Sequence, residues 1–396
     1  MDFADVRRLF PGATERVFLD AAAVSLTSTR AAEAVARFVE LVTRDPRAAH
    51  HGGDAARARE AAARLIGARP EQIALSPATT LALNIAADAV PLRRGDNVVT
   101  TDLEFMSVVV PWLEKCRAVE AELRVVRHEG GRIAADAVVA RLDERTRAVV
   151  LSSVQWTNGF RLDIQRIGQE CRRRDIPFVV DAIQQLGALP LDVEACAIDY
   201  LACAGHKWLT SPTGLGFVYA SPGFAERFRP TLTYAATAVP PRGDWPESWT
   251  DPDYDPIQTY ALPRTAARFE IGVHHGASGA GGLAAALGIF AELGPARIAD
   301  HVMTLGDRAA AGVRALDLEV VTHLDRAHRS GLTVFRAGPS PKDDLALRDH
   351  LLGRGIVVSV RYTSGVGGVR VSTHVYNDES DVERRLQAVH PWLKGR

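Results

Sequence analysis

Short apolar runs alternate with longer segments of helical periodicity through the first half of the chain. Residues 107–121 and 164–174 repeat apolar side chains every three or four positions, which is typical of amphipathic helices. Strands that alternate with helices pair in parallel through right-handed crossovers, so we expect an α/β fold whose sheet is covered by helices on both faces. The runs rich in branched residues, read as strands, are 97–101, 123–126, 148–151 and 178–181.

Two of these strands end on polar residues, Thr101 and Asp181. In open α/β sheets, sites lie beyond the carboxyl ends of the strands, so we expect a site at this edge. The chain has 396 residues, of which 47% are hydrophobic, and this suits a large domain with a smaller appendage.

Residues 231–260 break this pattern with five prolines among several aromatic residues. Proline at that density excludes a regular helix or a central strand, which leaves a packed surface loop or a lid facing the site or a partner. The glycine cluster at 276–282 lacks the frame of a dinucleotide-binding motif and is interpreted as a turn. It precedes an Ala/Leu-rich helix and a smaller α/β unit.

Charge and cysteine usage limit the classes of partner and of site that we expect for this chain. Lys plus Arg number 47 and Asp plus Glu 48, so no basic excess points to nucleic acid or a membrane surface. Residues 1–10 lack a secretory pattern, no apolar run approaches a membrane span, and the four cysteines show no zinc spacing. The adjacent pairs His50–His51 and His274–His275 are poor co-ligands, so we expect no metal site. Free cysteines suit a reducing compartment, so we expect a cytoplasmic protein.

The segment from Phe178 to Gln184 places a carboxylate at the end of an apolar strand. Burying Asp181 there is costly unless a cation meets it, and a pyridinium nitrogen is such a cation. Gln184 could reach the same ring from the first turn of a following helix. The alternative is that Asp181 only caps that helix.

Lys207 follows an apolar stretch and precedes a glycine-punctuated strand at 216–219. Desolvation lowers the pKa of a lysine, which lets it attack a carbonyl as a neutral amine. A single lysine is ordinarily a solvated surface charge, and it is the upstream Asp181 that favours the catalytic interpretation.

A third pattern starts at Ser76, read as the N-cap of a helix with Pro77 in its first turn. The amides and hydroxyls of Thr79 and Thr80 would then face a phosphate at the helix N-terminus. Ordinary capping explains the same residues.

Together these patterns resemble the class V aminotransferase superfamily of fold type I pyridoxal-phosphate (PLP) enzymes, in the branch of cysteine desulfurases, kynureninases and isopenicillin-N-epimerase-like proteins. The resemblance runs from Phe18 to Asn377 and includes Arg268–Gly272 and Arg370–Ser372. It implies a large PLP-binding domain, 16–275, with a mostly parallel seven-stranded sheet between helices. Residues 1–15 and 276–396 would form the small domain, and two copies would form a homodimer with sites at the interface.

The resemblance also implies a role for each matching residue. Lys207 would bind the cofactor as a Schiff base and exchange the Cα proton, Asp181 would pair with the ring nitrogen, and Gln184 would approach the phenolic oxygen. Arg370 would clamp the substrate carboxylate, a bidentate task suited to guanidinium. The ring of Phe105 would stack on the cofactor, and the phosphate would be held by His206, Thr79 and Thr80.

Departures from the family pattern matter as much. Residues 359–368 lack the mobile cysteine of desulfurases, and Ala204 and Val273 stand where phosphate-binding hydroxyls are usual. Arg361 and His275 are candidates to compensate and to contact substrate. Replacement of the usual pattern at 154–159 leaves Gln155 as a candidate cofactor contact and Asn158 as a candidate substrate contact.

The cofactor leaves the reaction open, because one lysine serves elimination, transamination and epimerisation. Phe105 and the absent loop cysteine point away from a desulfurase and toward a lyase or an epimerase-like member of the branch. We expect a lyase that eliminates a group at Cβ, by C–S cleavage or otherwise, because many members of this branch cleave bonds at Cβ or Cγ. An aminotransferase or epimerase of the same family is the alternative, and a catalytically silent PLP-fold binding module is a second one. The substrate's identity is not readable from the sequence.

Overall fold

A seven-stranded sheet organises the larger part of the computed structural model, which describes residues 1–46, 48, 53–233, 238–272 and 279–395. Its order is β2-β8-β7-β6-β5-β3-β4. The five strands from β7 to β4 pair in parallel, while β8 runs antiparallel to both of its neighbours. The strands are β2 (Ile73–Ser76), β3 (Asn97–Thr101), β4 (Glu122–Val126), β5 (Thr146–Ser152), β6 (Phe178–Asp181), β7 (Tyr200–Ala204) and β8 (Gly216–Ala220).

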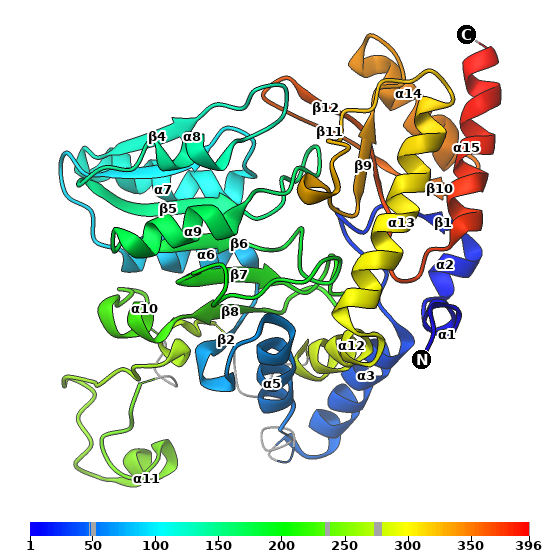
Figure 1. Ribbon diagram of the computed structural model, residues 1–396. Helices are drawn as coiled ribbons and strands as arrows, with labels where there is room; N and C mark the ends of the chain where they lie inside the picture. The colour runs from blue at the N-terminus through cyan, green and yellow to red at the C-terminus, as the bar shows by residue number, and fades with distance from the viewer. Residues whose placement is uncertain (47, 49–52, 234–237, 273–278, 396) are drawn as a thin grey trace.

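Helices cover both faces of this sheet (Figure 1). On one face the apolar core packs against α5 (Asp54–Ile66), α8 (Ala135–Val139), α9 (Ile164–Arg173) and α12 (Gly279–Leu293). On the other it packs against α6 (Thr79–Ala89), α7 (Met106–Val119) and α10 (Pro222–Arg227). The predicted α/β class, the mostly parallel seven-stranded sheet and the four predicted strands, each within two residues, are confirmed.

The C-terminal part forms a smaller α/β unit. Its antiparallel sheet has the order β11-β12-β9, and β1 (Val17–Phe18) pairs in parallel with β10 (Ile356–Val357). The remaining elements are β9 (Leu332–Phe335), β11 (Ser359–Thr363), β12 (Val366–Ser372), α13 (Pro295–Arg314), α14 (Pro341–Leu352) and α15 (Glu379–Lys394).

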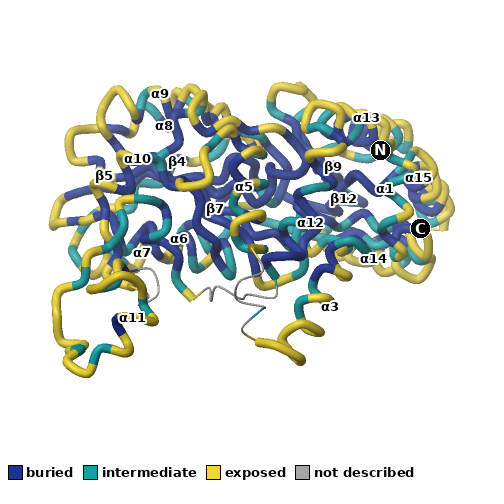
Figure 2. The backbone as a smooth tube through the Cα atoms, turned by 90° about the horizontal axis from the view of Figure 1, so that it is seen from below, coloured by how far each residue is buried: buried dark blue, intermediate teal, exposed yellow. Residues whose placement is uncertain are grey.

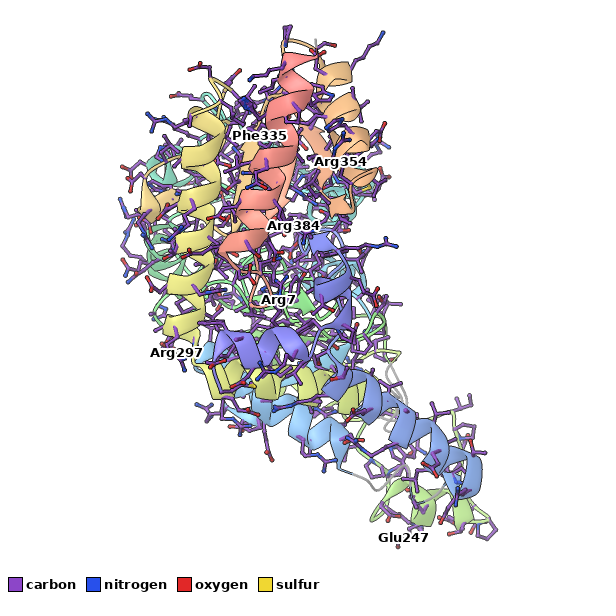
Figure 3. The ribbon with its side chains drawn as sticks, turned by 90° about the vertical axis from the view of Figure 1, so that its right-hand side faces the viewer. Arg7, Glu247, Arg297, Phe335, Arg354 and Arg384 are labelled. Atoms are coloured by element: carbon purple, nitrogen blue, oxygen red, sulfur yellow. The ribbon has the colours of Figure 1, made fainter. Side chains whose placement is uncertain are left out.

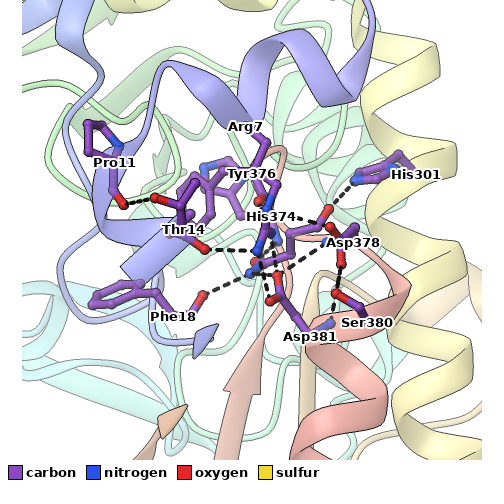
Figure 4. Close-up of polar contacts among 12 residues, drawn as sticks. Arg7, Pro11, Thr14, Phe18, His301, His374, Tyr376, Asp378, Ser380 and Asp381 are labelled. Carbon is purple, nitrogen blue, oxygen red and sulfur yellow. Dashed lines mark hydrogen bonds and ion pairs between the residues drawn. The ribbon is translucent and has the colours of Figure 1, made fainter. Parts of the chain in front are cut away.

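The N-terminal helices α1 (Phe3–Arg8) and α2 (Pro11–Glu15) lie against this unit. Arg7 donates to both carboxylate oxygens of Asp381, at 2.6 and 3.0 Å, and to the backbone carbonyl of Tyr376 at 2.6 Å (Figure 4). Asp381 is fully buried, so the Arg7 guanidinium offsets the cost of burying its charge. The two ends of the chain are thereby joined.

Three local expectations were wrong. Ser76 is the last residue of β2, and Ala78 rather than Ser76 occupies the N-cap of α6 without a side-chain hydrogen bond. Residues 279–282 belong to α12 and not to a turn, although 276–278 lie outside the described residues. The chain after Asp181 forms successive turns instead of a helix, so Gln184 lies on a turn.

The described residues of 231–260 are largely exposed and carry one short helix, α11 (Trp245–Thr250). Trp245 and Trp249 stack with ring centroids 5.6 Å apart, yet Trp249 remains 64% exposed. In Figure 2, α11 and α3 (Thr29–Arg44) project from the same side of the molecule, and Figure 3 places Glu247 of α11 far from Arg384 of α15. The described part of 231–260 is therefore a surface segment with its own aromatic contacts, and the choice between a packed surface loop and a lid stays open.

Within the described residues, no single helix is long and apolar enough to cross a membrane. Among the helices that the structure describes, α12 and α13 taken together reach the required length and hydropathy, but across an 84° bend. The described part of the chain also holds no group of three or more His, Cys, Asp or Glu side chains that could bind a metal ion. His50–His51 and His274–His275 lie outside the described residues.

Candidate active site

A pocket of about 390 Å³ opens at the carboxyl ends of the central strands and is bordered on its other side by Arg361 and Arg370 of the small unit. It contains residues that the sequence placed in three separate motifs. The predicted residues that line it are Thr79, Thr80, Phe105, Asp181, Gln184, His206, Lys207, Arg361 and Arg370.

Asp181 is the last residue of β6, and Lys207 lies three residues beyond the end of the adjacent parallel strand β7; both line the pocket. Asp181 is 3% exposed and accepts one hydrogen bond, from the Ile183 amide at 2.9 Å. Burial raises its pKa to about 6, although the Lys207 ammonium lowers it. Burial likewise lowers the pKa of Lys207 to about 8, with Asp181 opposing and Arg370 reinforcing the shift. About a tenth of Lys207 is therefore a neutral amine at pH 7, far more than for an ordinary lysine.

Gln184 is held by two hydrogen bonds on the wall of the pocket. Its Nε2 donates to the Ala22 carbonyl at 3.1 Å, and its Oε1 accepts from the indole Nε1 of Trp208 at 2.8 Å. Both Gln184 and Trp208 are buried, so the amide is fixed despite lying on a turn.

Hydroxyl groups gather where α6 and α7 begin. Thr79 Oγ1 accepts from the Ala204 amide at 2.8 Å, and the Thr80 and Ser107 hydroxyls are 2.7 Å apart. His206 lies on the same pocket, and burial beside Lys207 lowers its pKa. The free amides of two helix N-termini favour an anion here.

Arg370 is almost fully buried on β12 and is oriented by three partners. Its Nε donates to Ser359 Oγ at 3.2 Å, one terminal nitrogen donates to the Trp156 carbonyl at 2.8 Å, and the other lies 3.4 Å from Asp20. Burial lowers the pKa of Arg370 to about 10 and raises that of Asp20. Arg361 has no acidic ion-pair partner among the described residues and donates only to its neighbour's carbonyl.

An aromatic pair forms another wall. The rings of Phe105 and Trp156 meet edge to face with centroids 5.2 Å apart, and Lys207 Nζ lies 5.7 Å from the Phe105 centroid. The buried carboxylate of Glu104 joins their two loops: it accepts from Gln155 Nε2 and from the Ser152 amide, each at 2.9 Å.

Two predicted residues that the structure describes, Gln155 and Asn158, are not brought into this pocket. Gln155 lies behind it, because its amide is engaged by Glu104. Asn158 donates to the Gly131 carbonyl at 2.6 Å and lines a different pocket between the two units. His275, like Val273, lies outside the described residues. Gln155 and Asn158 therefore have structural partners here in place of the predicted contacts.

Several pocket residues were missed from the sequence. Ser107 is two positions after Phe105 at a helix N-terminus, and that position was the signal available for it. Trp156 lies beside the candidate Gln155. No local pattern identified Asp20 as a partner of Arg370, since 350 positions separate them.

The donor set fits PLP. Asp181 is a buried carboxylate with no cation hydrogen-bonded to it among the described residues, which suits a protonated ring nitrogen. Lys207 supplies an amine that is readily deprotonated, and the hydroxyls of Thr80 and Ser107 lie at two helix N-termini that suit a phosphate.

Comparison with known proteins agrees with the geometry. A probable cysteine desulfurase of Methanothermobacter thermautotrophicus is 28% identical, over 96% of this chain and 95% of the relative. An isopenicillin N epimerase of Amycolatopsis lactamdurans is 29% identical over 84% and 83%. The apo structure of a cysteine desulfurase from Thermococcus onnurineus NA1 superimposes with a TM-score of 0.86 at 26% identity, covering 99% of this chain and 98% of that one.

The family described as Aminotransferase class-V matches residues 17–384, nearly the whole chain. The expected family, the fold type and a PLP-dependent enzyme are thereby confirmed. This chain belongs to the class V aminotransferase family.

Proposed function

We propose that this protein is a PLP-dependent lyase that eliminates a leaving group from Cβ of an amino acid. The observation that carries the proposal is the convergence of Lys207, Asp181 and Arg370 on one pocket from three distant parts of the chain. The names of the desulfurase relatives agree with the lyase expectation, since desulfuration breaks a C–S bond at Cβ.

Each residue has a task in this reaction. PLP, when bound, withdraws electrons from the bonds at Cα. Asp181 holds the ring nitrogen in its protonated form, and Phe105 offers an aromatic face. Arg370 orients the substrate carboxylate, and Asp20 and Ser359 keep its guanidinium in position. Lys207, neutral in part because its pKa is lowered to about 8, accepts the Cα proton.

The leaving group departs without a cysteine acceptor on the adjacent loop. Residues 359–372 form the tight hairpin of β11 and β12, which turns at Ser364–Gly365 and contains no cysteine. Cys116, Cys171 and Cys203 are buried, and Cys196 is half-buried; none of the four lines the pocket. A sulfur leaving group would therefore be released as a free product.

The test is an amino-acid panel scored separately for pyruvate, ammonia, sulfide, keto-acid exchange and Cα deuterium uptake. Elimination predicts pyruvate and ammonia in equal amounts from a β-substituted substrate, with loss of both in Arg370→Ala. Keto-acid exchange without pyruvate would replace elimination by transamination.

Epimerisation is the second candidate, supported by the name of the isopenicillin N epimerase relative. It predicts Cα deuterium uptake with inversion and no pyruvate. A binding module without catalysis predicts a change in the visible spectrum with amino acids and no product of any kind.

We also propose that two copies associate. Apolar side chains are exposed on α3 (Val39 at 54%) and along one stripe of α7, at Met106 (65%), Val110 (49%) and Leu113 (39%). Ser107, next to Met106, lines the pocket, so a second copy on this stripe would border the site. Val110→Glu is expected to convert a dimer to monomers in light scattering. Monomers in the unmodified protein would contradict the proposal.

Two further parts of the proposal concern organisation and place. For the division into 16–275 and a small domain from 1–15 and 276–396, the Arg7–Asp381 pair supports grouping the N-terminal helices with α15. The packing of α12 in the core of the large sheet favours a boundary after Leu293 instead of 275. A cytoplasmic location is supported by four free cysteines. Limited proteolysis between α12 and α13 tests the division into domains. A thiol titration of the freshly isolated protein tests the cytoplasmic location.

A further inference from the structure

The side chain of Trp208 lies directly behind the pocket, one residue after Lys207. It is fully buried, and its indole Nε1 donates to Gln184 Oε1 at 2.8 Å. A Cβ atom at Gly331 would lie 2.6 Å from the indole ring, so the backbone of the small unit packs directly against it. The ring of His374 contacts it edge to face at 5.1 Å. The indole is therefore confined from two sides.

The hydrogen-bonding partners of Gln184 determine which way its side-chain amide faces. An indole N–H only donates, so the atom that meets it has to be the amide oxygen. The Ala22 carbonyl only accepts, so the atom 3.1 Å from it has to be the amide nitrogen. A flipped amide would place two donors together and two acceptors together in a buried site, which is costly.

We infer that Trp208 is a positioning residue that locks the Gln184 amide with its nitrogen toward the pocket, so that the second N–H of Nε2 donates to the phenolic oxygen of PLP. The inference deepens the proposed function and rests on it, because its target is an atom of that cofactor. A donor at this oxygen stabilises its negative charge. The oxygen then attracts the proton on the neighbouring nitrogen, the nitrogen that comes from Lys207, less strongly. The pKa of that nitrogen therefore falls.

The effect is measured by titrating the visible absorption band of the PLP-loaded protein with pH. Trp208→Phe keeps an aromatic ring and removes the N–H, so the amide is free to rotate. Loss of one hydrogen bond to a charged oxygen is expected to raise the midpoint of the titration by about one pH unit. Gln184→Ala is expected to give the same shift, and the double variant no larger one, because both changes remove one interaction.

A matched control is available in the same chain. Trp112 is equally buried, and its indole nitrogen has no hydrogen-bond partner. Trp112→Phe removes a buried N–H away from the pocket and is expected to leave the midpoint unchanged. A general loss of packing would move both variants alike, whereas a specific role moves only Trp208→Phe.

The outcomes separate the inference from the function. If Trp208→Phe does not fold, Gln184→Glu with Trp208 intact takes its place and is expected to raise the midpoint, since a carboxylate offers no donor. An unchanged midpoint in a folded Trp208→Phe, or in that substitute, overturns the inference. A wild-type protein that develops no visible band with PLP contradicts the proposed function itself.

Discussion

Glu104 makes the pH dependence of stability directly testable. It is 6% exposed, with Oε1 accepting from Thr101 Oγ1 and Gln155 Nε2, and Oε2 accepting from the Ser152 amide. Burial raises its pKa to about 7 from the ordinary 4.5. The folded protein therefore binds this proton more tightly than the unfolded chain does, and stability falls as the pH rises from about 4.5 to 7.

The magnitude follows from that shift. Each pKa unit corresponds to about 1.4 kcal/mol, so a shift of about 2.5 units removes about 3 kcal/mol over this interval. Glu104→Gln cannot titrate. Its amide also fits the site, because the Gln155 Oε1 atom has no partner and can accept from it after a flip. The variant is therefore expected to gain about 3 kcal/mol relative to wild type between pH 4.5 and 7.5.

Urea unfolding of both proteins across this pH range measures the difference, in which all other titrating groups cancel. Thr101→Val is the control, because it removes one donor but leaves the carboxyl group that titrates. Its stability still falls as the pH rises, and more steeply than in wild type, because the Thr101 hydroxyl helps to lower the pKa of Glu104. Parallel stability curves for wild type and Glu104→Gln would refute the reasoning.

Three further predictions concern the pocket. Arg370→Lys is expected to raise KM for the amino acid by 10²-fold or more, since a bidentate contact is lost, with PLP affinity unchanged in equilibrium binding; an unchanged KM would contradict the clamp. Covalent attachment of PLP to Lys207 should accelerate with pH, with a midpoint near pH 8, and Asp181→Asn should shift that midpoint downward in stopped-flow absorbance, because Asp181 holds the pKa of Lys207 up. The double variant Ser107→Ala with Thr80→Val is expected to bind both PLP and inorganic phosphate, measured as a competitor of PLP, about tenfold more weakly than wild type. If phosphate competes as well in the variant as in wild type, neither hydroxyl belongs to the phosphate site.

The sequence was sufficient where chemistry is local. A carboxylate at the end of an apolar strand identified Asp181, and the strand ending at Ala204 placed Lys207 beside it because parallel strands end at one edge. Short strands rich in branched residues were found to within two positions. The short strands of the small unit were not, since β9 and β10 have four and two residues and no periodicity to detect.

The partners that orient the predicted residues were out of reach. Asp20 meets Arg370 across 350 positions, and this contact depends on the pairing of Asp20 with Ser372 at the end of β12. No local pattern pointed to Trp208, because its hydrogen bond to Gln184 needs the turn after Asp181, where a helix was expected. Pairing between distant segments is set by tertiary packing, which no local pattern encodes.

The central claim is that Lys207 carries the cofactor. Incubation with PLP, reduction with borohydride and peptide mass spectrometry locate the modified residue directly. The account predicts one equivalent of phosphopyridoxyl on Lys207 and none in Lys207→Ala. Modification spread over surface lysines, or equal labelling of Lys207→Ala, would contradict it.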